Sequence, residues 1–544
     1  MDVAILSRIQ FFLTISFHFL FPPLTIGLGV MLVIMQAFWI RTRRPLYHDM
    51  ARFWTRVFGL IFAMGVASGI PMVFQFGTNW ATYSRFVGDV FGSPLAIEGI
   101  YAFFLESGFL GLLLFGWNRI GPKTHLFSTC MVALGAHFSA IWILVANSWM
   151  QTPAGFHLVR KVKMALDGQI FPLSANLGNT AFTIKELPLP ANYVLRPEDL
   201  HNVRAVVDNI WDVILNPSTL DRISHTLAGC WLAGAFLVIG VSAYYLLRNR
   251  HVESARSSLR MALVFGTISS LVMFVSADST ARGVAYNQPT KLAAMEGLAQ
   301  TQKNAPLGLV GIVQWQRNAD GHIVGIQEKA LRIPDLLSIL VSGNFLHPEK
   351  ASQTVVKGLA QLPSDEFLRT RYPEANAAEL AKIRPQYWPN VPVVFQTYHL
   401  MIAIGMALLG LSFLGCLLWA TGSLWRTQSA AIRTFLWLLV GSALLPIIGT
   451  QVGWMTAEMG RQPWIVYGIL KTSEAISPVV KGPQVLSSII LFFLIYAALL
   501  TLFLFLLFKM IGQGPQETVT DKTLPEGWQP LTLKEGRQTR GGEA

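Results

Sequence analysis

Ionisable and sulfur-containing side chains occur inside long apolar segments of this chain, where such groups are rare and usually functional. His18 lies in "TISFHFLFPP", Glu106 in "YAFFLESGFLG" and Glu458 in "GWMTAEMGRQPW", while His225 and Met401 lie in two further apolar segments. Histidine, methionine and carboxylate ligands without a cysteine cluster suit haem iron. A His–Met pair fills both axial positions of a haem and leaves it to carry electrons only. These residues therefore predict a membrane haem protein with protonable groups.

The number and spacing of the cysteines argue against other kinds of metal site. The chain has only three, Cys130, Cys230 and Cys416, all in apolar segments and without CxxC-type spacing. This pattern argues against a disulfide framework and against a zinc or iron–sulfur site.

Other functions remain open on the residues alone. A proton-coupled transporter would have a similar pattern of buried carboxylates, together with inverted repeats and broken helices. A membrane b-type cytochrome without oxygen chemistry would have bis-histidine pairs and no carboxylate ligand. Met401 by itself reads as a core-filling residue, and a hydrogen-bonded packing role is favoured for His137.

The elements that must position these residues are membrane-spanning helices. Of the 544 residues, 52% are hydrophobic and only 13% are charged, too few charges to cover a soluble protein of this size. The net charge of +12 is spread over many short loops, which argues against a nucleic-acid partner. No cleavable signal peptide is expected, so the first apolar segment is a span.

We predict an all-α polytopic membrane protein with about nine spans. The predicted spans cover residues 9–40, 54–78, 95–117, 125–148, 222–247, 261–277, 392–420, 432–455 and 487–509. Basic short loops follow spans one, three, five and seven, so the N-terminus is expected outside and the C-terminus in the cytoplasm. In that orientation every candidate residue lies in the outer half or near the middle of the membrane.

The spans divide the chain into four parts. Residues 1–277 hold six helices and an external loop at about 151–221, and residues 278–391 form a larger external loop. Residues 392–511 hold the last three helices, and residues 512–544 form a cytoplasmic tail. A loop as long as the second one is usually functional, and its Asp320-Gly321 pair predicts a β-hairpin.

Two carboxylates share one predicted span. Glu98 opens this span and Glu106 lies eight residues deeper, about 12 Å along a regular helix. The angular offset is roughly 80°, so both side chains can face the same side of the bundle. An unpaired carboxylate as deep as Glu106 suggests a proton path or a ligand.

Five strings together resemble subunit I of the cytochrome bd-type quinol oxidases. They are "GWMTAEMGRQPW", "ISHTLAG", "NQPTKLAAMEG", "ANSWMQTPAG" and "IEGIYAFFLESGFLGLLLFGW". The resemblance runs from "SRIQF" near the N-terminus to the end of the last span, and the GRQPW and QPxKLAAxE strings are specific to this family. The chain is most similar to the cyanide-insensitive branch, which has a short quinol loop.

The resemblance implies three haems and their ligands. His225 and Met401 match the axial ligands of a low-spin haem b, and Glu458 matches the ligand of a high-spin haem b. His18 matches the ligand of the oxygen-reactive haem, which is haem d or a third haem b. The resemblance provides no copper site.

The resemblance also implies roles for residues around the haems. Glu98 and Glu106 match carboxylates that serve coordination or proton delivery, and Lys291 and Glu296 match quinol-binding residues. Asn147 and Arg461 match further residues near the haems. Trp454, read from its residue type alone, can pack on a haem face or lie in the interfacial belt, and the sequence does not separate these. One departure is His399, which stands where many members carry arginine.

The function implied is that of a quinol:oxygen oxidoreductase. Quinol is oxidised at the outer face, O₂ is reduced to water, and protons drawn from the cytoplasm make the reaction electrogenic. The expected partners are quinol, O₂, the lipid bilayer, a second large membrane subunit and a single-span small subunit. The expected location is the bacterial cytoplasmic (inner) membrane.

Overall fold

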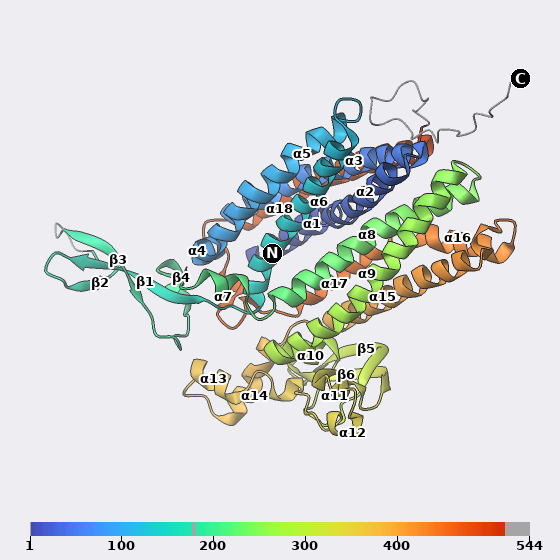
Figure 1. The fold of residues 1–544 in the computed structure, drawn as a ribbon. Helices are drawn as coiled ribbons and strands as arrows, with labels where there is room; N and C mark the ends of the chain where they lie inside the picture. The colour runs from blue at the N-terminus through green and yellow to red at the C-terminus, as the bar shows by residue number, and fades with distance from the viewer. Residues whose placement is uncertain (1, 177–180, 517–544) are drawn as a thin grey trace, which may run out of the picture.

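The computed structural model describes residues 2–176 and 181–516 and consists of a bundle of long helices with two folded loops at one end (Figure 1). We call this end, which carries residues 152–218 and 288–390, the loop end. The long helices are α1 (Val3–His18), α2 (Pro22–Thr42), α3 (Pro45–Gly77), α4 (Ala81–Ile97), α5 (Phe104–Phe115), α6 (Pro122–Gln151), α8 (Thr219–Leu247), α9 (Val252–Asn287), α15 (Val391–Ala420), α16 (Ala430–Ser442), α17 (Leu445–Met459) and α18 (Gly482–Gln513).

The prediction of an all-α membrane protein with about nine spans is confirmed. Eight helical segments of the described chain are long and apolar enough to cross a membrane, and α16 with α17 forms a ninth that is bent by 41°. Prolines stand in the first turn after the two principal breaks, at Pro22 and Pro23 in α2 and at Pro446 in α17. Because proline cannot donate the backbone hydrogen bond of a helix interior, it favours a new helix start at these points.

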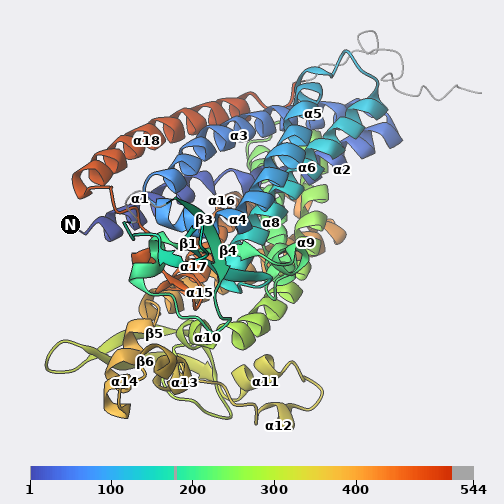
Figure 2. The same cartoon turned by 90° about the vertical axis from the view of Figure 1, so that its left-hand side faces the viewer.

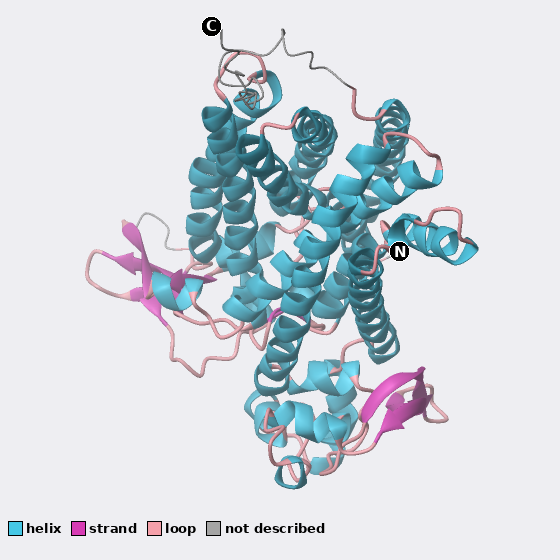
Figure 3. Ribbon diagram, turned by 45° about the vertical axis from the view of Figure 1, so that its right-hand side comes forward, coloured by secondary structure: helices cyan, strands magenta, loops and turns pink. Residues whose placement is uncertain are grey.

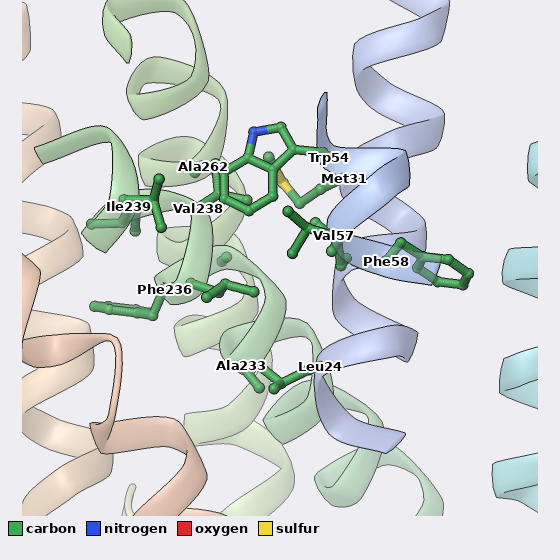
Figure 4. Close-up of a cluster of buried hydrophobic side chains, with 14 of the residues drawn as sticks. Leu24, Met31, Trp54, Val57, Phe58, Ala233, Phe236, Val238, Ile239 and Ala262 are labelled. Atoms are coloured by element: carbon green, nitrogen blue, oxygen red, sulfur yellow. The ribbon is translucent and has the colours of Figure 1, made fainter. Parts of the chain in front are cut away.

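Small residues bring the central helices together. An added Cβ at Gly27 of α2 would lie 2.1 Å from the carbonyl oxygen of Cys230 in α8, and Gly234 lies equally close to the backbone of α2. Glycines at such a crossing let two membrane helices approach to backbone contact. Large side chains of α2, α3, α8 and α9, including Met31, Trp54 and Phe236, fill the core beside this crossing (Figure 4).

Two helices are longer than predicted because their polar residues have partners. α9 continues to Asn287, ten residues beyond the predicted span, since Asp278 forms a 2.8 Å salt bridge with Arg282 and Ser279 bonds to Asp221 of α8. The predicted third span begins earlier, with α4 at Ala81, and Asp89 of α4 accepts the Val207 amide at 2.9 Å. The sequence boundary at 277/278 therefore falls inside a helix.

The first long loop folds into a small antiparallel sheet that the sequence did not predict. β1 (Phe156–Ala165) is central, with β2 (Ile170–Pro172) and β3 (Phe182–Pro188) beside its second half and β4 (Val203–Val207) beside its first. The short helices η2 (Pro197–His201) and α7 (Ile210–Ile214) complete the loop. Figure 2 shows the sheet beside α4, and Figure 3 shows it apart from the second strand pair.

The second long loop contains the predicted hairpin. β5 (Leu307–Arg317) pairs with β6 (Ile323–Ile333), and Gly321 in the turn has φ +81°, a conformation that favours glycine. The other elements of this loop are α10 (Pro289–Met295), α11 (Leu336–Ser342), α12 (Pro348–Ala351), η3 (Leu359–Gln361), α13 (Asp365–Arg371), α14 (Ala377–Ile383) and η4 (Arg384–Tyr387). Elsewhere lie η5 (Ser423–Trp425), β7 (Trp464–Val466), β8 (Leu470–Lys471) and η6 (Thr472–Glu474). Most of the predicted tail, residues 517–544, lies outside the described residues.

Candidate functional site

The two histidines predicted as haem ligands, His18 and His225, are each oriented by a serine on a neighbouring helix. His18 Nδ1 lies 3.1 Å from Ser68 Oγ of α3, and His225 Nδ1 lies 3.3 Å from Ser276 Oγ of α9. Each serine donates its own proton to a backbone carbonyl one turn earlier, so its oxygen accepts from the histidine. The proton is thereby held on Nδ1, and Nε2 keeps the lone pair that binds iron.

Two other histidines are engaged at both ring nitrogens. His137 Nδ1 lies 2.7 Å from Ala133 O, and Trp231 donates to its Nε2 at 2.9 Å. His399 Nδ1 lies 2.8 Å from Phe395 O, and its Nε2 lies 3.2 Å from Gly308 O. These contacts favour packing roles for His137 and His399.

Met401 lies against a glycine of α17. An added Cβ at Gly453 would meet Met401 Sδ at 2.9 Å, closer than an ordinary contact. One turn earlier on α17, the methyl carbon of Thr450 packs against Gly229, which follows His225 by one turn on α8. Met401 and the helical turn that follows His225 therefore both approach α17 within one turn, at Gly453 and Thr450.

Glu458 is the penultimate residue of α17 and receives three donors. Asn147 Nδ2 donates to Oε1 at 3.0 Å, Gln151 Nε2 donates to the same oxygen at 3.2 Å, and Arg461 forms a salt bridge with Oε2. Both Asn147 and Gln151 come from the last turn of α6. These donors hold the side chain as a carboxylate, the form that binds iron.

Positive charge exceeds negative charge around this carboxylate. Arg222 donates to Asn147 Oδ1, and Lys291 Nζ donates to Gln151 Oε1 at 2.6 Å. Burial and the nearby Arg222 hold the pKa of Lys291 well below its usual range. Arg461 Nε and Nη1 are buried without a hydrogen-bond partner. Because a buried cationic donor without a partner is costly, the cluster is suited to an anionic group, and haem propionates fit this donor set.

The two predicted proton-handling carboxylates both face α6. Ser139 Oγ donates to Glu98 at 2.7 Å, and an added Cβ on Gly135, one turn away on α6, would lie 2.9 Å from Glu106 Cβ. The two side chains therefore share one side of the bundle, as expected. The assumption of a regular helix was wrong, because Glu98 opens the six-residue π-helix η1 (Glu98–Phe103). Such a π segment is frequent at functional sites.

The predicted quinol residues are buried rather than open on the loop. Lys291 is 3% exposed and Glu296 is 1% exposed. Glu296 Oε2 accepts the Gly308 amide at 3.2 Å, whereas its Oε1 has no hydrogen-bond partner. Burial raises the pKa of Glu296 to about 7. Tyr398 also hydrogen-bonds the Glu296 carboxyl group, so Glu296 is a buried, hydrogen-bonded carboxyl group whose pKa is raised to about 7.

A cavity of about 220 Å³ lies between the second loop and the segment after α17, and it is not lined by Lys291 or Glu296 themselves. Its lining includes Arg461 and the aromatic side chains of Tyr387 and Trp464. It also includes Thr290, the residue that precedes Lys291 in the sequence. Trp464 packs against Tyr387 and Phe367 of the loop. Trp454, in contrast, stacks on Phe12 of α1 with ring centres 5.8 Å apart.

Sequence reasoning missed four residues of the site. Gln151 stands inside the quoted "ANSWMQTPAG" string, and Arg222 precedes His225 by one helical turn, so both could have been noticed. Ser68 and Ser276 gave no comparable signal, because single serines are common in membrane helices. Their role depends on which helix each one faces.

A bundle of nine candidate spans with two serine-oriented histidines, a methionine and a donor-rich carboxylate defines a membrane protein suited to hold haem. The family model for cytochrome bd terminal oxidase subunit I matches residues 6–515. The chain is 34% identical over 557 residues to cytochrome bd-II ubiquinol oxidase subunit 1 of Escherichia coli (strain K12), covering 94% of this chain and 97% of that protein. It is 33% identical over 521 residues to cytochrome bd ubiquinol oxidase subunit 1 of Bacillus subtilis (strain 168), covering 95% of each.

The fold agrees with a solved structure of this kind. The bd oxidase from Geobacillus thermodenitrificans matches with a TM-score of 0.73 and 27% sequence identity, covering 94% of this chain and 99% of that one. The chain belongs to the cytochrome bd terminal oxidase subunit I family. It is a multi-span protein of the bacterial inner membrane, and haem cofactors come with the family.

Proposed function

We propose that this chain oxidises quinol at the loop end and passes the electrons through haem to O₂, which is reduced to water. One observation carries the proposal. Lys291, on the loop that matches the family's quinol-binding loop, bonds to Gln151, and Gln151 bonds to Glu458, the proposed iron ligand. A single side chain thus separates the proposed site of quinol oxidation from the proposed site of a haem.

The ligand assignments follow the resemblance to the family, and the contacts described above support them. Bound haem supplies the electron transfer and the oxygen binding. His225 and Met401 hold the low-spin haem b, Glu458 holds the high-spin haem b, and His18 holds the oxygen-reactive haem, which is haem d or a third haem b. Ser68 and Ser276 fix the tautomers of the two histidines.

The proposed quinol site uses the second loop. Lys291 and Glu296 handle the quinol hydroxyl groups, and the Glu296 carboxyl, which Tyr398 also hydrogen-bonds, is the acceptor for one of them. The flat ring would lie in the neighbouring cavity, whose Tyr387 and Trp464 supply aromatic walls. The absence of a long insertion in this loop supports placement in the short-loop, cyanide-insensitive branch.

Protons for oxygen reduction are proposed to come from the opposite, cytoplasmic side. Glu106, which is 7% exposed, and Glu98, which is bonded to Ser139, are the relay. Quinol protons leave at the loop end, so each turnover separates charge without a pump. By analogy with the family, a second large membrane subunit and a single-span small subunit complete the enzyme.

The experiment is oxygen uptake by the purified complex, driven by a short-chain quinol. Lys291→Ala should abolish quinol-driven uptake, because it removes a residue of the proposed quinol site. Lys303→Ala, which removes an exposed lysine of the same loop, is the matched control and should leave uptake unchanged. Full uptake by Lys291→Ala would refute the quinol site. No uptake by the wild-type complex with any quinol would refute the proposed reaction.

A further inference from the structure

A second, small polar cavity is lined in part by Lys291. Its volume is about 30 Å³, enough for roughly two water molecules. Gln151, Asp221, Arg222 and Lys291 line it, and the other lining residues are mostly polar: Thr152, Ser218, Thr280, Gly283, Val284, Asn287 and Gln288. Polar walls of this kind hold water.

We propose that this cavity is the route by which a quinol proton leaves the protein, from Lys291 through water to Asp221 and then to the solvent at the loop end. The inference rests on the proposed function, which makes Lys291 a residue of the quinol site. Nothing in the family assignment gives Asp221 a role.

Asp221 is the one carboxylate among the residues that line this cavity. It is the third residue of α8, partly exposed, and its Oδ1 accepts the Ser279 hydroxyl at 2.6 Å. An added Cβ at Gly283 of α9 would meet Oδ2 at 2.8 Å. A glycine inside a helix costs about 1 kcal/mol relative to alanine, and here it leaves room for the carboxylate at the cavity wall.

Lys291 is suited to the first step of such a route. Its Nζ is fixed by Gln151 Oε1, and burial holds its pKa well below the usual range for lysine, which favours the neutral amine that can accept a proton. The charged groups that act on Lys291 are Arg222, which lines the same cavity, Glu458 and Arg461. The positive charge of Arg222 favours rapid loss of a proton from Lys291.

The proton step balances as follows. Quinol becomes quinone and gives up two electrons, one at a time, to the haem of the proposed function. The O–H bond of one quinol hydroxyl breaks and its proton passes to the ionised carboxylate of Glu296. The O–H bond of the other hydroxyl breaks and an N–H bond forms on neutral Lys291. That N–H bond then breaks as a proton passes to cavity water and on to the carboxylate of Asp221, which releases it to the solvent.

Asp221 also has a structural explanation, because an acidic residue in the first turn stabilises a helix and the Ser279 bond joins α8 to α9. Substitutions separate the two explanations. Asp221→Asn keeps a hydrogen-bond acceptor but cannot carry a proton, Asp221→Glu keeps the carboxylate, and Ser279→Ala removes only the bond. Asp212→Asn, on the exposed helix α7, is the matched control.

The test uses the complete oxidase in liposomes, with quinol-driven oxygen uptake and acidification on the loop side as readouts. Asp221→Asn should slow both by about tenfold or more and increase the solvent deuterium isotope effect, as expected for loss of a proton acceptor. Asp221→Glu, Ser279→Ala and Asp212→Asn should remain within about twofold of wild type. Oxidation of the pre-reduced Asp221→Asn enzyme by O₂ should stay fast, because that reaction needs no quinol proton.

Quinol oxidation at the wild-type rate by Asp221→Asn would overturn the inference. If that variant does not assemble, Gly283→Ala displaces the carboxylate without removing it and should slow acidification; an unchanged rate would again overturn the inference. Failure of the proposed function would give a different result from failure of the exit route. If Lys291→Ala also turns over normally, the quinol site itself is wrong, whereas an inactive Lys291→Ala beside a normal Asp221→Asn rejects only the exit route.

Discussion

Gly453→Ala should remove Met401 from its haem while leaving the fold intact. The added methyl carbon would lie 2.9 Å from Met401 Sδ, whereas unstrained non-bonded heavy atoms stay about 3.5–4.0 Å apart. The sulfur must therefore move by roughly 0.6–1.1 Å, and an axial bond to iron cannot follow a displacement of that size. The haem should lose its sixth ligand and become high-spin.

The cost to folding should be small. The obstructing atom belongs to a flexible side chain, and alanine is favoured over glycine in a helix by about 1 kcal/mol. The thermal midpoint of the complex should therefore change little, which separates loss of the ligand from general damage. Gly405→Ala on α15 is the matched control, because an added methyl group there meets nothing within 4 Å.

The assay is the reduced-minus-oxidised optical spectrum of the purified variants. Gly453→Ala should lose most of the low-spin haem signal, as should Met401→Leu and His225→Ala, while Gly405→Ala should keep it. A full low-spin signal in Gly453→Ala and Met401→Leu would refute the assignment of Met401 as a ligand.

Three further changes test the rest of the site. Glu106→Gln should leave haem reduction by quinol fast but stall oxygen reduction, because the amide cannot ionise; flow-flash kinetics would measure this, and wild-type turnover would remove Glu106 from the path. Quinol oxidation should rise with pH through about 7, because the pKa of Glu296 is raised to about 7 and only its ionised form can accept a proton; Glu296→Gln should flatten that profile, and an unchanged profile would exclude Glu296 as the base. Gln151→Leu should weaken quinol oxidation and alter the high-spin haem spectrum together, because Gln151 contacts both Lys291 and Glu458; the control is Gln36→Leu, a buried glutamine bonded to Thr129, and an effect on only one readout would contradict the link.

The spans were predictable because twenty consecutive apolar residues have few alternatives to a membrane helix. The candidate ligands were predictable for the same reason, since a histidine or glutamate stands out inside such a segment. The helix ends were less accurate, because Asp278 and Arg282 look like loop residues until their mutual salt bridge is known.

Other features depend on contacts between distant segments. The sheet around β1 lies in polar sequence with weak alternation, and β1 pairs with β4, a strand that follows it by about 50 residues. The π-helix at Glu98 and the burial of Lys291 also have no local signature, because each depends on the packing of neighbouring helices. The serine that orients His18 lies 50 residues away in sequence, so only the fold shows the pair.

The most direct test of the central claim, that this chain is the haem-bearing oxidase subunit proposed above, is a visible and pyridine-haemochrome spectrum of the purified complex, recorded with and without O₂. The account predicts three haems, one of them low-spin, and an oxygen-sensitive band from the haem held by His18. A colourless protein, or haem that is all low-spin and does not react with O₂, would contradict it.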